Sequence, residues 1–243
     1  MRVFGLLGKT LKHSFSKAYF TNKFSELKLS DCSYENFELN SISELQELLS
    51  SNPSIQGLNV TIPYKQDVIP FLHEQNEIVR NVKACNCIKI VDDKLHGFNT
   101  DVIGFQQSLK KLLEPHHRKA LILGTGGSSK AVEYALKHLG IDYLFVSRSK
   151  KEQVISYNEL TQEILSNHSV IINTSPSGMY QNVTEAPQIP YQFITSQHLL
   201  FDLIYNPEKT IFLQRGEQQG AKICNGAEML ILQAEESWRI WNS

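Results

Sequence analysis

A lysine and an aspartate are candidates for moving a proton. Lys65 ends the run Asn59-Val60-Thr61-Ile62-Pro63-Tyr64-Lys65, and Asp101 follows Asn99-Thr100. Pro63 suits the first turn of a helix, so the run predicts a helix that begins there and carries Lys65 in its first turn. The positive end of the helix dipole would favour the neutral amine, which is the form that accepts a proton. Asp101 could orient this amine and a substrate hydroxyl; an exposed lysine and a helix-capping aspartate are the structural alternatives.

A glycine-rich turn in the second half could hold a dinucleotide. The turn Gly124-Thr125-Gly126-Gly127-Ser128-Ser129 follows an apolar strand predicted at residues 119–123. A helix with apolar spacing follows it, and a strand is predicted at 143–147. In this unit, glycines let the backbone approach a pyrophosphate at the N-terminus of the helix. Gly124, Gly126, Gly127 and Ser128 are therefore predicted to bind the cofactor; an ordinary structural turn is the alternative.

The residues after the second strand favour NADP over NAD. A site for NAD expects Asp or Glu roughly 20 residues beyond the glycines, to bind the ribose 2′-hydroxyl. Here the chain reads Ser147-Arg148-Ser149-Lys150-Lys151. Arg148 could form two charge-assisted hydrogen bonds with a 2′-phosphate, and Ser149 could donate a third. A solvated basic loop is the alternative, and Glu152 lies close by.

Short polar side chains gather in the first half. Ser14 and Ser16 precede or begin a predicted helix, where either could act as a cap, Ser16 in particular. Asn59 and Thr61 share one face of a predicted strand. Asn86 lies between Cys85 and Cys87, a pair that could suggest a metal clip. Zinc sites usually show two spaced Cys/His pairs, and no second pair is evident here, so reduced thiols in a strand are the favoured interpretation and no metal is expected.

Strands and helices alternate along the chain. This order predicts an α/β protein whose sheet is mainly parallel with one antiparallel element. A hairpin is predicted across Asp92-Asp93, and the last helix keeps an apolar stripe. The predicted strands span residues 3–7, 34–39, 55–60, 86–91, 94–98, 119–123 and 143–147, and the predicted helices span 16–29, 44–49, 101–113 and 228–241.

The composition of the chain argues against several classes of function. The 243 residues suffice for one large or two small domains, and 41% are hydrophobic. Lys plus Arg (24) nearly balances Asp plus Glu (25), which argues against nucleic-acid binding. No apolar run approaches the ~20 residues that cross a bilayer. Lys9 interrupts the N-terminal apolar stretch too early for a signal peptide, so we expect a cytoplasmic protein with no membrane partner.

Taken together in order, these motifs resemble the shikimate dehydrogenase family, the NADP-dependent shikimate 5-dehydrogenases. The resemblance runs through the whole chain, and its ordered set is far more specific than any single motif. The matching segments are Ser14-Phe15-Ser16, Asn59 to Lys65, Asn86, Asn99-Thr100-Asp101 with Gly104-Phe105, Gly124 to Gly127, Ser147-Arg148-Ser149, Asn173 to Met179, Tyr205-Asn206-Pro207, and Gly226 to Gln233.

The resemblance implies a fold, a reaction and a set of roles. Residues 1–101 would form an α/β substrate-binding domain, to which the helix at 226–243 returns. Residues 102–225 would form a Rossmann-like NADP-binding domain, with a cleft between the two. The reaction would be the reversible reduction of 3-dehydroshikimate to shikimate with NADPH, in aromatic amino acid and chorismate biosynthesis, by a monomer or homodimer. Lys65 would be the acid/base with Asp101 as its partner; Ser14, Ser16, Asn59, Thr61, Asn86, Tyr205 and Gln233 would bind substrate; and Leu203 and Gly226 would line the nicotinamide pocket.

Three departures from the family pattern and three alternatives remain. Lys17 replaces a usual proline, Cys87 replaces a usual threonine, and only about 22 residues separate Arg148 from Ile171, which shortens the wall on the adenosine side. The alternatives are an NAD-using quinate/shikimate dehydrogenase, a non-catalytic NADP-binding sensor on the same fold, and a methylenetetrahydrofolate dehydrogenase-like protein. The last would need a larger, more apolar pocket than these serines and asparagines make.

Overall fold

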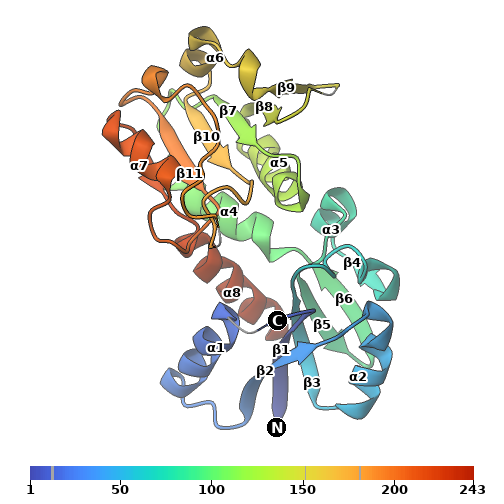
Figure 1. Cartoon of the computed structure of the whole chain (residues 1–243). Coiled ribbons are helices and arrows are strands. Elements are labelled where there is room, and N and C mark those ends of the chain that lie inside the picture. The colour runs from blue at the N-terminus through green and yellow to red at the C-terminus, as the bar shows by residue number, and fades with distance from the viewer. Residues whose placement is uncertain (12–13, 151, 181) are drawn as a thin grey trace. The chain divides into compact units, whose positions relative to one another are not determined.

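The chain folds into two compact α/β units. This computed structural model describes residues 1–11, 14–150, 152–180 and 182–243 (Figure 1). The first unit comprises residues 1–100 and 234–243, and the second comprises residues 101–233. His13, beside the serine pair, and Lys151, in the basic run, lie outside the described residues. Along the described ranges, no helix is both long and apolar enough to cross a membrane.

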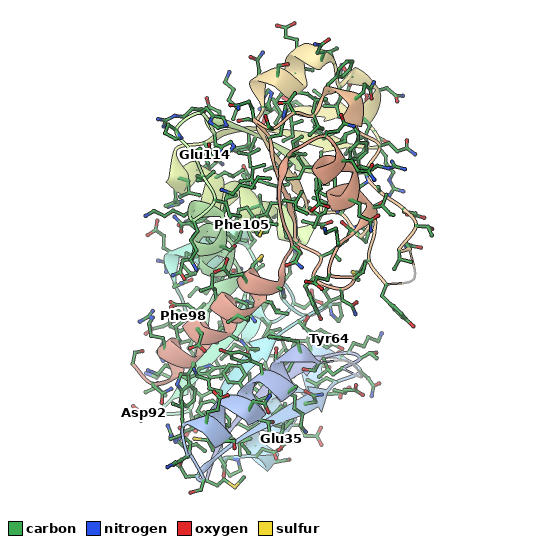
Figure 2. All side chains as sticks on the ribbon, turned by 90° about the vertical axis from the view of Figure 1, so that its left-hand side faces the viewer. Glu35, Tyr64, Asp92, Phe98, Phe105 and Glu114 are labelled. Carbon is green, nitrogen blue, oxygen red and sulfur yellow. The ribbon has the colours of Figure 1, made fainter. Side chains whose placement is uncertain are left out.

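The first unit is built on a mixed six-stranded sheet. The strand order is β2-β1-β3-β5-β6-β4, and β5 runs antiparallel to both of its neighbours, β3 and β6. The predicted hairpin is confirmed: Asp92 and Asp93 connect β5 to β6 with φ of 49° and 59°, the positive values that a two-residue hairpin turn requires. Figure 2 labels Asp92 at this turn and Phe98 at the end of β6. The strands are β1 (Arg2–Gly8), β2 (Cys32–Glu38), β3 (Ile55–Val60), β4 (Glu74–Gln75), β5 (Cys87–Val91) and β6 (Lys94–Phe98).

Two apolar cores lie on the two faces of this sheet, because successive strand side chains point to opposite sides. Leu7 packs in one core with residues of α2 (Leu45–Ser51) and α3 (Glu77–Val82). Phe4 packs in the other core, with α1 (Phe15–Glu26) and the end of α8 (Ala227–Trp241). In this second core the Trp241 ring stacks on Phe4, with centroids 4.8 Å apart, and its indole N–H donates to the Ile88 carbonyl at 2.9 Å.

The predicted helix that begins at Pro63 is wrong. Residues 62–68 form consecutive turns after a cis Ile62–Pro63 peptide, and a short 3₁₀ segment follows at Ile69–Phe71. In a helix the Lys65 carbonyl would accept from the amide of residue 69. Here it accepts from the Cys85 amide at 2.7 Å, so a distant segment takes the group that a helix would use. Lys65 therefore lies in a series of turns and not in the first turn of a helix, so no helix dipole acts on its amine.

The second unit carries a fully parallel six-stranded sheet in the order β12-β11-β10-β7-β8-β9. The predicted strand–turn–helix–strand unit is confirmed, and its helix ends at Gly140, whose φ of 68° suits a glycine cap. The strands are β7 (Lys119–Leu123), β8 (Asp142–Ser147), β9 (Val154–Ser156), β10 (Val170–Asn173), β11 (Leu199–Asp202) and β12 (Lys222–Cys224), and the helices are α4 (Thr100–Lys110), α5 (Gly127–Leu139), α6 (Gln162–Asn167), α7 (Ile211–Gln218) and the first half of α8.

The connection from β8 to β9 is unusually short. Parallel neighbours are ordinarily joined by a dozen or more residues that include a helix. Here residues 148–153 suffice, because β9 is only three residues long and pairs with the end of β8. The segment between Arg148 and Ile171 noted in the sequence thus holds the edge strand β9, and the helix α6 lies between β9 and β10.

Candidate active site

A buried chain of polar side chains connects three elements of the first unit. The Tyr34 hydroxyl donates to Asn59 Oδ1 at 2.9 Å. Asn59 Nδ2 donates to Ser237 Oγ at 2.8 Å and to the Asn86 carbonyl at 3.3 Å. Asn59 is only 4% exposed, so its amide is committed to internal partners. Asn59 thereby fixes Tyr34 and the residues around Asn86.

Asn86 fastens the start of α4 to β5. Its Oδ1 accepts from the Thr100 amide at 2.6 Å, and its Nδ2 donates to Thr100 Oγ1 at 3.0 Å. Ser237 lies 3.3 Å from Thr100 Oγ1 and ties α8 into the same network. Asp101, in the first turn of α4, therefore follows a residue whose backbone and side chain are both held.

The remaining predicted residues of the first unit lie at the start of α1 and in the turns that follow β3. Ser14, not Ser16, is the N-cap of α1, since its hydroxyl accepts from the Lys17 amide at 3.2 Å. Thr61 directly follows β3, and its amide donates to the Leu7 carbonyl at 2.9 Å. Lys65 is half-buried, four residues further along the turns. Ser16 is thus free of the capping role that would have been its simplest explanation.

The glycine turn of the second unit is open on the side a ligand would use. Gly124 has a φ of 113°, and a Cβ there would lie 2.9 Å from Thr174 Oγ1, so this position requires glycine. A Cβ on Gly126 or Gly127 would meet nothing within 4 Å. Protein packing therefore does not demand those two glycines, whereas close approach of a pyrophosphate to the start of α5 would.

A pocket of about 960 Å³ brings the predicted cofactor residues together. Gly124 and Gly126 line it, as do Arg148 and Ser149 from the end of β8. Gly127 and Ser128 follow directly, as the first residues of α5. The glycine turn follows β7 and the exposed Arg148 guanidinium follows the neighbouring strand β8, an arrangement that fits a dinucleotide with an additional phosphate. Ser147 Oγ accepts from the Ser149 amide at 3.3 Å, which shapes the turn after β8.

Leu203 and Gly226 touch each other through their backbones. A Cβ on Gly226 would lie 2.2 Å from the Leu203 carbonyl oxygen, so only glycine fits there. The Gly226 amide donates to the Ile204 carbonyl at 3.1 Å. Tyr205 is exposed, and Gln233, on α8, is buried with its Nε2 donating to the Leu230 carbonyl at 2.9 Å.

Comparison with known proteins identifies the family. A profile of the shikimate dehydrogenase substrate binding domain matches residues 6–88. A shikimate dehydrogenase (NADP(+)) from Caldicellulosiruptor bescii is 36% identical over 258 residues, covering 99% of this chain and 89% of the relative. The chain belongs to the shikimate dehydrogenase family.

Solved structures of the shikimate dehydrogenase family have the same fold. The chorismate mutase/shikimate 5-dehydrogenase fusion protein from Clostridium acetobutylicum is 35% identical, with a TM-score of 0.88 over 100% of this chain and 91% of that one. The shikimate 5-dehydrogenase of Thermus thermophilus, in complex with NADP(H) and shikimate, is 27% identical with a TM-score of 0.87, over 99% and 93% of the two chains. The predicted α/β fold class and the family resemblance are therefore confirmed.

A buried aspartate supports the loop that carries Leu203 in this shikimate dehydrogenase family member. Asp202 accepts from Asn173 Nδ2 at 3.1 Å, from the Ile204 amide at 3.1 Å and from Thr210 Oγ1 at 2.6 Å. Burial nevertheless raises the pKa of Asp202 to about 6, and these three donors only limit the rise. Sequence motifs did not single out Asp202; its place at the end of an apolar strand was the available signal.

We expect Asp202→Asn to stabilise the protein at neutral pH and Asp202→Ala to destabilise it. A raised pKa means that the stabilisation from Asp202 is fully present below its unfolded pKa of about 3.9 and is lost as pH rises through about 6. Asparagine keeps an acceptor and can donate to Thr210, so the gain above about pH 7 is up to about 3 kcal/mol. Alanine leaves buried donors unpaired and should cost about 1–3 kcal/mol.

Urea unfolding between about pH 4 and pH 8 measures both variants. The wild-type stability should fall across the pH interval around 6 relative to the asparagine variant. Parallel pH profiles for the two proteins would contradict the raised pKa of Asp202.

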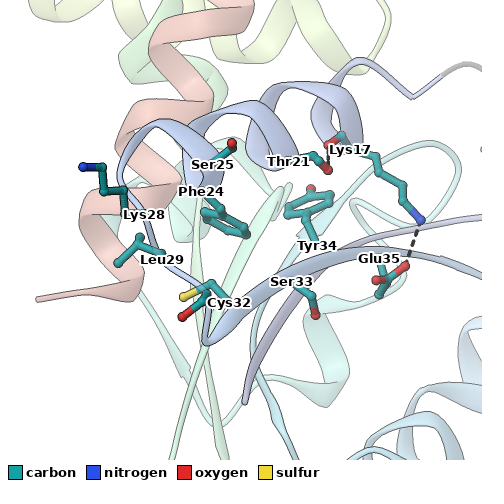
Figure 3. Close-up of a pocket in the computed structure, with 11 residues that line it drawn as sticks. Lys17, Thr21, Phe24, Ser25, Lys28, Leu29, Cys32, Ser33, Tyr34 and Glu35 are labelled. Atoms are coloured by element: carbon teal, nitrogen blue, oxygen red, sulfur yellow. Dashed lines mark hydrogen bonds and ion pairs between the residues drawn. The ribbon is translucent and has the colours of Figure 1, made fainter.

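The first unit has a separate hollow of about 520 Å³ between α1 and β2, shown in Figure 3. Phe24, Leu29 and Tyr34 supply its apolar lining, and Lys17 pairs with Glu35 at 2.8 Å at one end. None of the residues predicted to bind substrate or cofactor lines it. Lys17, the departure from the family's proline, therefore serves as an ion-pair partner at the side of the substrate-binding unit.

Several residues of the two sites were missed by sequence reasoning. Tyr34 and Ser237 belong to the buried network of the first unit. Tyr157, Glu185 and Arg215 line the pocket of the second. Their positions follow from strand register and long-range packing. Only for Tyr34 did the sequence carry a signal, namely the alternating pattern that predicts the strand at residues 34–39.

Proposed function

We propose that this protein catalyses the reversible reduction of 3-dehydroshikimate to shikimate with NADPH, as a cytoplasmic enzyme of aromatic amino acid biosynthesis. The observation that carries this is the full-length likeness to NADP-dependent shikimate dehydrogenases, combined with an open glycine cradle that has Arg148 at the end of β8. The first unit would bind the substrate and the second NADP(H). The enzyme would act as a monomer or homodimer.

Short polar side chains would recognise the substrate. Ser14 and Ser16 would bind its carboxylate, with Tyr205 nearby, while Thr61, Asn86, Asp101 and Gln233 would bind ring hydroxyls. Asn59 would act together with them, although its buried contacts favour a positioning role through Tyr34. Many specific hydrogen-bonding partners suit such a ligand, because an analogue that leaves one buried partner unpaired is strongly rejected.

Lys65 would be the acid/base. In the direction of reduction, its ammonium donates a proton to the ketone oxygen as the carbonyl carbon accepts hydride, so the products are the alcohol and a neutral amine. In the reverse direction the amine removes the hydroxyl proton. Asp101 would be its partner and would orient the Lys65 amine and the substrate hydroxyl.

The second unit would hold the cofactor, which supplies the hydride. The backbone of Gly124, Gly126, Gly127 and Ser128 would contact the pyrophosphate at the start of α5. Arg148 and Ser149 would bind the 2′-phosphate, and Leu203 and Gly226 would line the nicotinamide pocket. The close contact between Leu203 and Gly226 gives that wall a fixed backbone.

The decisive experiment adds 3-dehydroshikimate to purified protein and NADPH, and follows loss of the reduced nicotinamide absorbance. We expect oxidation of NADPH with stoichiometric shikimate formation. Parallel reactions with NADH and with quinate plus NAD test the quinate/shikimate alternative, which predicts the higher rate in those arms. Tight NADPH binding without turnover on any of these substrates would instead identify a sensor.

A further inference from the structure

A tyrosine that no family motif includes lies beside the arginine expected to bind the 2′-phosphate. β8 and β9 are parallel neighbours, and their last paired residues are Ser147 and Ser156. Arg148 directly follows β8 and Tyr157 directly follows β9, so the two residues lie side by side at the carboxyl edge of the sheet. Both line the same pocket of about 960 Å³ as Gly124.

The Tyr157 hydroxyl is suited to donate a hydrogen bond near Arg148. Its ring is half-buried against the core of the second unit, and burial raises the pKa of Tyr157 while the charge of Arg148 opposes that rise. The phenol therefore keeps its proton at neutral pH. The paired ends of β8 and β9 place the guanidinium and the phenol along the same pocket.

Lys150, two residues after Arg148, forms its ion pair outside the pocket. Lys150 pairs with Glu159 at 2.5 Å and is not among the residues that line the pocket. Glu159 also accepts from the Ser156 amide at 2.8 Å and from the Ser156 hydroxyl at 2.9 Å, in a capping box around Tyr157. These bonds fasten the turn after β8 to the turn that carries Tyr157, and they leave Arg148 and the phenol facing the pocket.

We propose that Tyr157 is a second specificity-determining residue for NADP(H), whose hydroxyl donates to the 2′-phosphate held by Arg148. The proposal rests on the proposed function, since it concerns the same cofactor site. The short β8–β9 connection contributes to this arrangement, because it sets β9 beside β8 and brings Tyr157 to the strand ends that carry Arg148.

Tyr157→Phe tests the proposal, because it removes the hydroxyl and keeps the ring. Affinities for NADPH, NADH, 2′,5′-ADP and 5′-AMP are measured by titration calorimetry. A hydrogen bond to a charged group is worth a loss of about 10–100-fold for NADPH and 2′,5′-ADP. NADH and 5′-AMP should bind the variant as they bind wild type.

Tyr143→Phe is the matched control. Its hydroxyl donates to Glu133 Oε1 at 2.6 Å in the same unit, and it does not line the pocket. Equal losses for the phosphorylated and unphosphorylated ligands in Tyr157→Phe, or no loss for either, would overturn the proposal. Wild-type protein that binds NADPH yet does not reduce 3-dehydroshikimate would refute the proposed function alone, since the Tyr157 comparison uses binding only.

Discussion

Lys65→Ala should lower kcat by about 10²–10⁴-fold, the usual contribution of a positioned general acid or base. KM for shikimate should change little, because the lysine acts on the proton that moves in the transition state. Steady-state rates in both directions, with NADPH and with NADP, measure this. Equal reductions of kcat and kcat/KM are the signature of an interaction made only in the transition state.

The control for Lys65→Ala is Lys94→Ala, which removes an exposed lysine at the start of β6, beside the hairpin turn. It should retain wild-type rates. Near-normal turnover by the Lys65 variant would remove this residue from the chemistry, whereas a rise in KM with unchanged kcat would make it a substrate-binding residue.

Arg148→Ala should weaken NADPH binding by about 10–100-fold and leave NADH nearly unaffected. The guanidinium would form two charge-assisted bonds with the 2′-phosphate, a group that NADH lacks. Arg148 is exposed at the rim of the pocket, so its replacement should not disturb the fold. The ratio of kcat/KM values for the two cofactors, measured for wild type and variant, reports the effect directly.

Arg118→Ala is the matched control for Arg148. Arg118 is an exposed arginine of the same unit that precedes β7, and its Nε donates to the Pro115 carbonyl at 2.8 Å. We expect no change in cofactor preference from it. Similar losses for NADPH and NADH in Arg148→Ala would count against recognition of the 2′-phosphate.

Short sequence patterns predicted the parts of the fold in which residue type sets the backbone conformation, such as turns and helix ends. Asp92 and Asp93 occupy positive φ in the hairpin turn, and Gly140 ends α5, as their residue types indicate. The helix at Pro63 failed because the Lys65 carbonyl bonds the Cys85 amide, a partner twenty residues away in sequence that no local pattern contains. β9 and β12 are three-residue strands, too short for periodicity to reveal.

The candidate site likewise contains residues that local sequence patterns predict and residues that only tertiary packing brings together. The glycine turn and Arg148 follow a strand–turn–helix–strand pattern that can be read from the sequence, and the structure brings them to one pocket. Tyr157 joins that pocket only through the register of β9 against β8. Tyr34 joins Asn59 through a bond between β2 and β3, which are separated by β1 in the sheet. Such contacts depend on tertiary packing rather than on residue spacing.

The docking of residues 234–243 on the first unit has a consequence for synthesis of the protein. On the ribosome, β1 to β6 emerge early, but Phe4 lacks its Trp241 partner until the whole second unit has been translated. The later-encoded unit, whose residues 101–233 are contiguous, can therefore complete its fold first, in reverse of the usual N-to-C order. A nascent chain stalled before residue 234 would present the open aromatic face of its first sheet to chaperones.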